Sequence, residues 1–141
     1  MSRTIGHSLA LIGFVGTGSA IVLPWAQYGG IDVDLFRFPL WGLYIAAAIA
    51  LQAVVLWRLV RDDRRATIAG IVLGLATIAA AVVVIFDYDN ASTFFGPIVP
   101  MVIPRPGVGG PLAVLAAICS TVAAVAPRRA PAPATTASAA V

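Results

Sequence analysis

The sequence predicts an all-α membrane protein, a bundle of four transmembrane helices with a small extracytoplasmic cap made of a β-hairpin and loops. Of the 141 residues, 60% are hydrophobic and only 11% are charged, whereas a soluble domain carries about a quarter charged residues. A chain this short leaves much of its surface exposed, so a larger core cannot accommodate the extra hydrophobic residues. Its apolar surface therefore needs lipid as its solvent, and the apolar residues fall into four long stretches.

Each stretch is close to the roughly 20 residues that a helix needs to cross a bilayer. Three of them carry no charge, and the second carries only Arg58, which we expect to extend to the lipid headgroups. The fourth is the shortest when counted from Pro111, a residue that suits a first helical turn. Continuous apolar runs indicate helices rather than the alternating strands of a membrane barrel. The expected helices are residues 4–23, 40–60, 66–86 and 108–126.

The arginines indicate how the helices are oriented. Cytoplasmic loops of membrane proteins are enriched in basic residues, and with four spans only Arg37 and Arg105 fall on the side opposite the termini. The chain has no lysine and no glutamate, which is typical of a GC-rich bacterial genome. We therefore expect both termini in the cytoplasm and the chain in the bacterial plasma membrane. The arginines on the side of the termini are Arg3, Arg58, Arg61, Arg64, Arg65, Arg128 and Arg129.

The two ends of the chain have interpretations of their own. Residues 1–127 form the predicted transmembrane domain, and residues 128–141, mainly alanine, proline, serine and threonine, are expected to be a disordered cytoplasmic tail. A cleaved signal peptide is an alternative for the first span, because Arg3 precedes an apolar run with small residues at 18–20. Cleavage would leave three helices. The apolar run continues to Leu23, which favours an uncleaved span.

Two outer segments, residues 24–39 and 87–107, are expected to form the cap. In the first, Gly29-Gly30 is a turn signal, and apolar residues alternate with others after it, which predicts a β-hairpin. In the second, four prolines interrupt an apolar stretch and exclude a regular helix. We expect an irregular segment that lies along the headgroups or packs over the bundle. The prolines are Pro97, Pro100, Pro104 and Pro106.

The cap holds most of the aromatic residues, which favour the boundary between membrane and water. Exposed aromatic and apolar surface often marks a binding site. We expect the cap to bind a membrane protein partner or a second copy of the chain; the alternative is that it only seals the bundle. The partner-binding candidates are Trp25, Tyr28, Phe36, Phe94, Phe95 and Met101.

Candidate metal ligands are limited to two Asp-x-Asp pairs on the outer side. If each pair is extended, its carboxylates share one face and offer oxygen ligands to Ca²⁺ or Mg²⁺. The favoured interpretation is solvated acids at helix ends. With His7 and Cys119 as the single residues of their kinds, no haem, multi-cysteine site or other cofactor is expected, and a net charge of +3 gives no indication of nucleic-acid binding. The aspartates are Asp32, Asp34, Asp87 and Asp89.

Small residues in the third span predict close contact between helices. Gly70 and Gly74 lie one turn apart, and small residues let helices approach where lipid provides no hydrophobic drive. We expect both glycines to pack within the chain, and a dimer face is the alternative.

Short motifs carry a resemblance to known membrane proteins. Leu23-Pro24-Trp25 ends the first span, a Gly-Gly hairpin follows, and residues 39–42, Pro-Leu-Trp-Gly, open the second. This layout resembles small four-helix membrane proteins of actinobacteria and, in outline, claudin-type proteins, whose first outer segment is a small sheet. The claudin signature includes a cysteine pair in that segment, which this chain lacks. The resemblance implies a membrane protein and transfers no functional residue.

The spans hold little that would indicate an enzyme or a pump. Ion-coupled transporters and proton pumps usually carry an ionisable residue at depth, and here the charges lie only near the ends of the spans. We therefore expect a non-enzymatic accessory or scaffold protein of the bacterial cell envelope, acting as a subunit of a larger membrane complex. The alternatives are a small transporter or channel component that works as an oligomer, and a lipid-handling enzyme.

Overall fold

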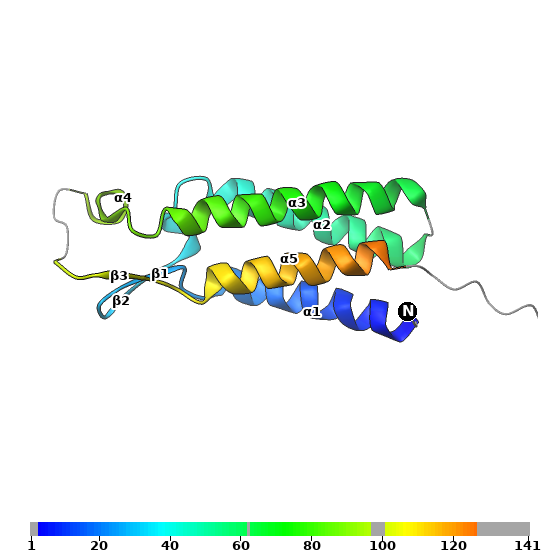
Figure 1. Cartoon of the computed structure of the whole chain (residues 1–141), viewed down its shortest axis with the longest axis horizontal. Helices are drawn as coiled ribbons and strands as arrows, with labels where there is room; N and C mark the ends of the chain where they lie inside the picture. Colours follow the sequence, from blue (N-terminus) through cyan, green and yellow to red (C-terminus); the bar gives the residue numbers. More distant parts are fainter. Residues whose placement is uncertain (1–2, 62, 97–100, 127–141) are drawn as a thin grey trace, which may run out of the picture.

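The computed structural model describes residues 3–61, 63–96 and 101–126. The predicted tail at 128–141 lies outside these residues, as do Pro97 and Pro100. Within the described ranges the chain is mostly helical, with long helices side by side and a small sheet at one end of them (Figure 1). Three of these helices are long and apolar enough to cross a membrane, α1 (Arg3–Val22), α2 (Trp41–Val60) and α3 (Arg64–Phe86). The apolar helix α5 (Gly109–Val125) is shorter.

The connection between α2 and α3 is short and held by local contacts. Helix α3 begins at Arg64 rather than at residue 66, because Asp63 caps it: the Asp63 carboxylate accepts a hydrogen bond of 2.9 Å from the Arg65 amide. At the end of α2, the Arg61 guanidinium lies 4.8 Å from the centre of the Trp57 ring, a cation–π contact. The two helices lie antiparallel (Figure 1).

The helices form an uneven bundle. Helix α3 packs against both α2 and α5, whereas α1 packs chiefly against α5 and barely touches α2. The close contact between α1 and α5 depends on Gly13 and Gly16: a Cβ atom at Gly16 would lie 3.0 Å from the Ala116 Cβ, and one at Gly13 would lie 3.0 Å from the Ser120 amide nitrogen. The first helix is thus fixed to the last one, and the side of the bundle between α1 and α2 is open.

The two glycines of α3, Gly70 and Gly74, lie against α5 of the same chain. A Cβ atom at Gly70 would lie 2.6 Å from the Ala124 Cβ, and one at Gly74 would lie 2.9 Å from the Thr121 Cβ. Both glycines are buried within the bundle. The two backbones therefore approach at a separation that leaves no room for a side chain at these points.

The cap contains the predicted hairpin. Strand β1 (Ala26–Tyr28) pairs antiparallel with β2 (Ile31–Val33) across a two-residue turn. Gly29 has φ of 65°, the left-handed value that the first position of a type II′ turn requires and that glycine adopts without strain. A short 3-10 helix, η1 (Leu35–Arg37), then leads to α2.

The described parts of the segment 87–107 contain two elements that were not expected. A short helix, α4 (Ala91–Phe95), precedes the prolines, and β3 (Pro104–Pro106) adds a third strand, in the order β2-β1-β3. Prolines exclude a helix but not an edge strand. The Gly107 amide bonds to the Trp25 carbonyl at 2.9 Å, and Arg105 pairs with Gln27. Because bonded pairs alternate along an antiparallel ladder, Pro104 and Pro106 fall where no amide hydrogen is needed.

Candidate functional site

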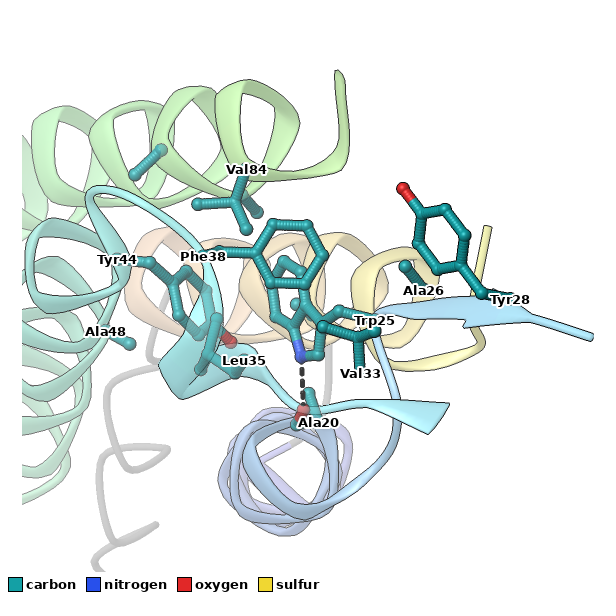
Figure 2. Close-up of a cluster of buried hydrophobic side chains, with 13 residues drawn as sticks. Ala20, Trp25, Ala26, Tyr28, Val33, Leu35, Phe38, Tyr44, Ala48 and Val84 are labelled. Atoms are coloured by element: carbon teal, nitrogen blue, oxygen red, sulfur yellow. Dashed lines mark hydrogen bonds between the residues drawn. The ribbon is translucent and has the colours of Figure 1, made fainter. Parts of the chain in front are cut away.

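The cap and the ends of the helices next to it share one hydrophobic core, with Trp25 at its centre (Figure 2). The Trp25 side chain is 2% exposed, and its Nε1 donates a 2.8 Å hydrogen bond to the Ala20 carbonyl in the last turn of α1, where carbonyls lack helical partners. Its ring meets Tyr44 edge-on at 5.2 Å between centroids. A Cβ atom at Gly109 would lie 2.6 Å from Trp25 Cδ1, so the start of α5 also rests on this ring.

A second aromatic group joins the hairpin to the segment after α3. The Tyr28 hydroxyl donates a 2.7 Å hydrogen bond to the Tyr88 carbonyl, and the Tyr28 ring packs edge-on against Phe94 and Phe95, at 6.0 and 5.1 Å between centroids. Burial raises the pKa of the Tyr28 phenol, and the negative charges of Asp89 and Asp87 raise it further. Tyr28 therefore stays protonated and keeps this bond.

These contacts divide the partner-binding candidates. Trp25 and Tyr28 are buried and belong to the core of the cap, so their side chains are not available to a partner. Phe94 and Phe95 are half-buried against that core. Phe36, 52% exposed, and Met101, fully exposed, remain on the surface.

The candidate metal ligands form no cluster. Within the described ranges, no three histidine, cysteine or acidic side chains come together as a metal site. Asp32 accepts a 2.9 Å hydrogen bond from the Gln27 amide, Asp34 precedes η1 as its N-cap, and Asp89 is exposed. Asp87 accepts a weak 3.4 Å bond from Asn90 through Oδ1, while its enclosed Oδ2 finds no partner among these residues.

The most distinctive polar group is one that the sequence interpretation did not single out, Gln52 in the middle of α2. Its side chain is 8% exposed, and its amide nitrogen donates to Ser120 Oγ of α5 at 2.9 Å and to Thr17 Oγ1 of α1 at 3.0 Å. Gly13 O lies 3.5 Å from the same nitrogen. One amide thus joins three helices. The sequence did contain a signal for this contact, because a single amide side chain inside an apolar run has to face a polar partner.

The open side of the bundle forms a groove in front of this amide. Two adjoining pockets, of about 360 and 270 Å³, lie between α1 and α2 and share Phe14, Gln52 and Leu56. We call them together the α1–α2 groove. It extends from His7 to Ile21 along α1, or roughly 20 Å at 1.5 Å per residue. Apart from His7, Thr17 and Gln52, its lining residues carry no polar side chain.

The expectation that Arg58 extends to the headgroups is corrected by the structure. Its side chain is only 8% exposed, and its Nε donates a 3.1 Å hydrogen bond to the Ala124 carbonyl. That carbonyl lies at the C-terminal end of α5, where helical partners run out and a positive charge is favoured by the helix dipole. Arg58 therefore turns inward because α5 ends within its reach.

Comparisons with known proteins identify no relative of this chain. No protein-family model, curated protein or solved structure matches the chain. The function has to follow from the groove, the polar contact at Gln52 and the exposed part of the cap.

Proposed function

We propose that the chain is a non-enzymatic accessory protein held in the bacterial plasma membrane by four helices, and that it binds a membrane protein partner through the exposed part of its cap. The length of α5 is consistent with a fourth span, because its 17 residues cover about 25 Å at 1.5 Å each, close to the hydrocarbon thickness of ~30 Å. It also lies alongside the three longer helices (Figure 1).

The proposed orientation follows the arginines. The α2–α3 connection, with Arg61, Arg64 and Arg65, lies at the end of the bundle opposite the cap (Figure 1), and basic loops stay in the cytoplasm. The cap then faces the outside.

Reporter fusions test this topology. Fusions after Arg64 and after Arg129 should report a cytoplasmic position, and fusions near Gly30 and Asn90 an external one, because the arginine asymmetry fixes the orientation. Alkaline phosphatase, active outside, and green fluorescent protein, fluorescent inside, give opposite readouts at each site. A C-terminus outside the cell would exclude four spans with this orientation.

The observation that carries the proposed partner is apolar surface on a part of the cap that extends past the ends of the helices (Figure 1). Met101 is fully exposed, and Ile103 is 87% exposed. Beside them, a hollow of about 450 Å³ lies between the hairpin residues Gln27 and Gly29 and the segment leading to Arg105. Apolar side chains beyond the lipid are costly in water unless another surface covers them.

Surface and core variants of the cap separate partner binding from a sealing role. Met101→Ser and Phe36→Ser remove exposed apolar groups, so we expect each protein to stay folded while its co-purifying membrane protein falls at least severalfold. Purification in mild detergent with quantitative mass spectrometry measures this loss. Phe94→Ser is the matched control, because Phe94 packs 4.7 Å from Phe38 in the core and its loss should lower thermal stability instead. Unchanged co-purification in both surface variants would remove the support for a cap partner.

A further inference from the structure

Gln52 has an unused hydrogen-bonding atom. Every hydrogen bond that it makes to a described residue runs from its amide nitrogen. The orientation of the amide follows from chemistry, because the Thr17 hydroxyl already donates to Gly13 O at 2.8 Å and needs a donor in return. Gln52 Oε1 is left without a donor.

That oxygen faces the α1–α2 groove. In the described part of the chain, Asp87 Oδ2 is the one enclosed side-chain oxygen or nitrogen without a partner, so Gln52 Oε1 is not enclosed. Gln52 lines both pockets of the groove, so this oxygen has open space on the groove side of the residue. A carbonyl oxygen that faces hydrocarbon without a donor is costly.

The depth of this oxygen limits what can supply the donor. Gln52 lies near the middle of α2, and Gly13, whose carbonyl is 3.5 Å from the Gln52 amide nitrogen, lies near the middle of α1. Lipid headgroups, which carry the donors of ordinary phospholipids, stay at the membrane surface. A side chain on a membrane-spanning helix reaches this depth, and small residues at the groove, Gly18 and Ala53, allow its backbone to approach closely.

A second copy of the chain is a poor source of the donor. In the middle of the described helices, the exposed side chains are all carbon, apart from glycine. They include Leu11, Ile12, Phe14, Val15, Ile49, Leu56, Val72, Leu75, Leu115 and Ile118. A neighbouring copy that placed any of these side chains against the amide would leave Gln52 Oε1 unpaired.

We infer that the α1–α2 groove receives a membrane-spanning helix of a different protein, and that an amide or hydroxyl side chain at mid-depth on that helix donates a hydrogen bond to Gln52 Oε1. The inference rests on the proposed membrane-embedded accessory role and names where its partner crosses the bilayer. It does not depend on the cap.

Synthetic transmembrane helices provide the probe. One peptide has 20 leucine and alanine residues with a single asparagine at its centre, and the other has leucine at that position. With the full-length chain in phosphatidylcholine nanodiscs, energy transfer between fluorescent labels should show the asparagine peptide binding about threefold to tenfold more tightly, the range typical of interhelical hydrogen bonds. Equal affinities of the two peptides would overturn the inference.

Infrared spectroscopy reads the proposed atom directly. The chain has glutamine only at positions 27 and 52, so Gln27→Asn with ¹³C-labelled glutamine leaves one labelled side-chain carbonyl. Its band should shift to lower wavenumber when the asparagine peptide is added and stay in place with the leucine peptide. A band that does not respond to the asparagine peptide would refute the hydrogen bond to Oε1.

A blocked groove provides the steric test. A Cβ atom at Gly18 has no neighbour within 4 Å, so the Gly18→Leu protein should fold. Its new side chain should fill the part of the groove nearer the cap, and the affinity for both peptides should fall at least tenfold. Ala76→Leu, on an exposed face of α3, should bind both as wild type. Wild-type affinity of Gly18→Leu, or self-association that this variant abolishes, would contradict a foreign helix. Phe36→Ser should bind the peptides normally, so failure here is distinguishable from failure of the cap proposal.

Discussion

Replacing Trp25 by alanine is expected to lower the free energy of unfolding by ~3–5 kcal/mol, the cost typical of truncating a large buried aromatic side chain. The ring is 2% exposed and lies between Tyr44, Phe38 and the start of α5. Its removal also leaves the Ala20 carbonyl without the indole donor. The cap should loosen before the helices separate.

Unfolding in mild detergent, followed by circular dichroism, measures this loss. The matched control is Trp41→Ala, because Trp41 is 39% exposed and its ring packs edge-on against the exposed Phe36; its effect should be much smaller. Trp25→Phe keeps most of the packing but not the N–H group, so it should cost about 1–3 kcal/mol, the penalty of an unpaired buried acceptor. Equal stabilities of the Trp25→Ala and Trp41→Ala proteins would show that Trp25 does not organise the cap.

The second large effect is expected for Gly74→Leu, which should destabilise the bundle by ~3 kcal/mol or more, at the upper end of the range for overpacked cores. The new side chain would collide with Thr121, whose Cβ lies 2.9 Å from the position of its first carbon atom. The backbones of α3 and α5 would have to separate, and the close packing between the two helices would be lost.

Gly42→Leu is the control for this substitution. A Cβ atom at Gly42 has no neighbour within 4 Å, so the same change of side chain on an exposed surface should leave the melting temperature nearly unchanged. The measurement is the melting temperature of the two variants and of the wild type in the same detergent. A Gly74→Leu protein as stable as wild type would mean that the contact between α3 and α5 is not needed for the fold.

The features that the sequence predicted well depend on neighbours along the chain. Apolar runs of the right length predict the long helices, and Gly29-Gly30 predicts the hairpin because two adjacent residues decide the turn. The Asp63 cap, which starts α3 two residues before the predicted residue 66, was not predicted although it too is a local signal. Such signals act over a few residues, so one sequence suffices to find them.

The features that were missed depend on contacts between distant segments. Strand β3 forms because β1 offers it an unpaired edge, and a Pro-Arg-Pro segment gives no strand signal of its own. Gln52 becomes a junction only where Thr17 and Ser120 happen to meet it. Arg58 turns inward because α5 ends nearby. Each of these three features depends on which segments are neighbours in the fold, and hydrophobic periodicity does not reveal which segments are neighbours.

The pairing of the first helix with the last has a consequence for how the protein is made. During synthesis, α1 is complete long before α5 exists, and it barely contacts α2, the helix that follows it. At roughly 5–20 residues per second, the ribosome needs several seconds to reach Gly109. Through that interval Gly13 and Gly16 have no α5 to pack against, and β1 has no β3 at its edge. The bundle and the cap therefore cannot be complete until β3 and α5 have been made.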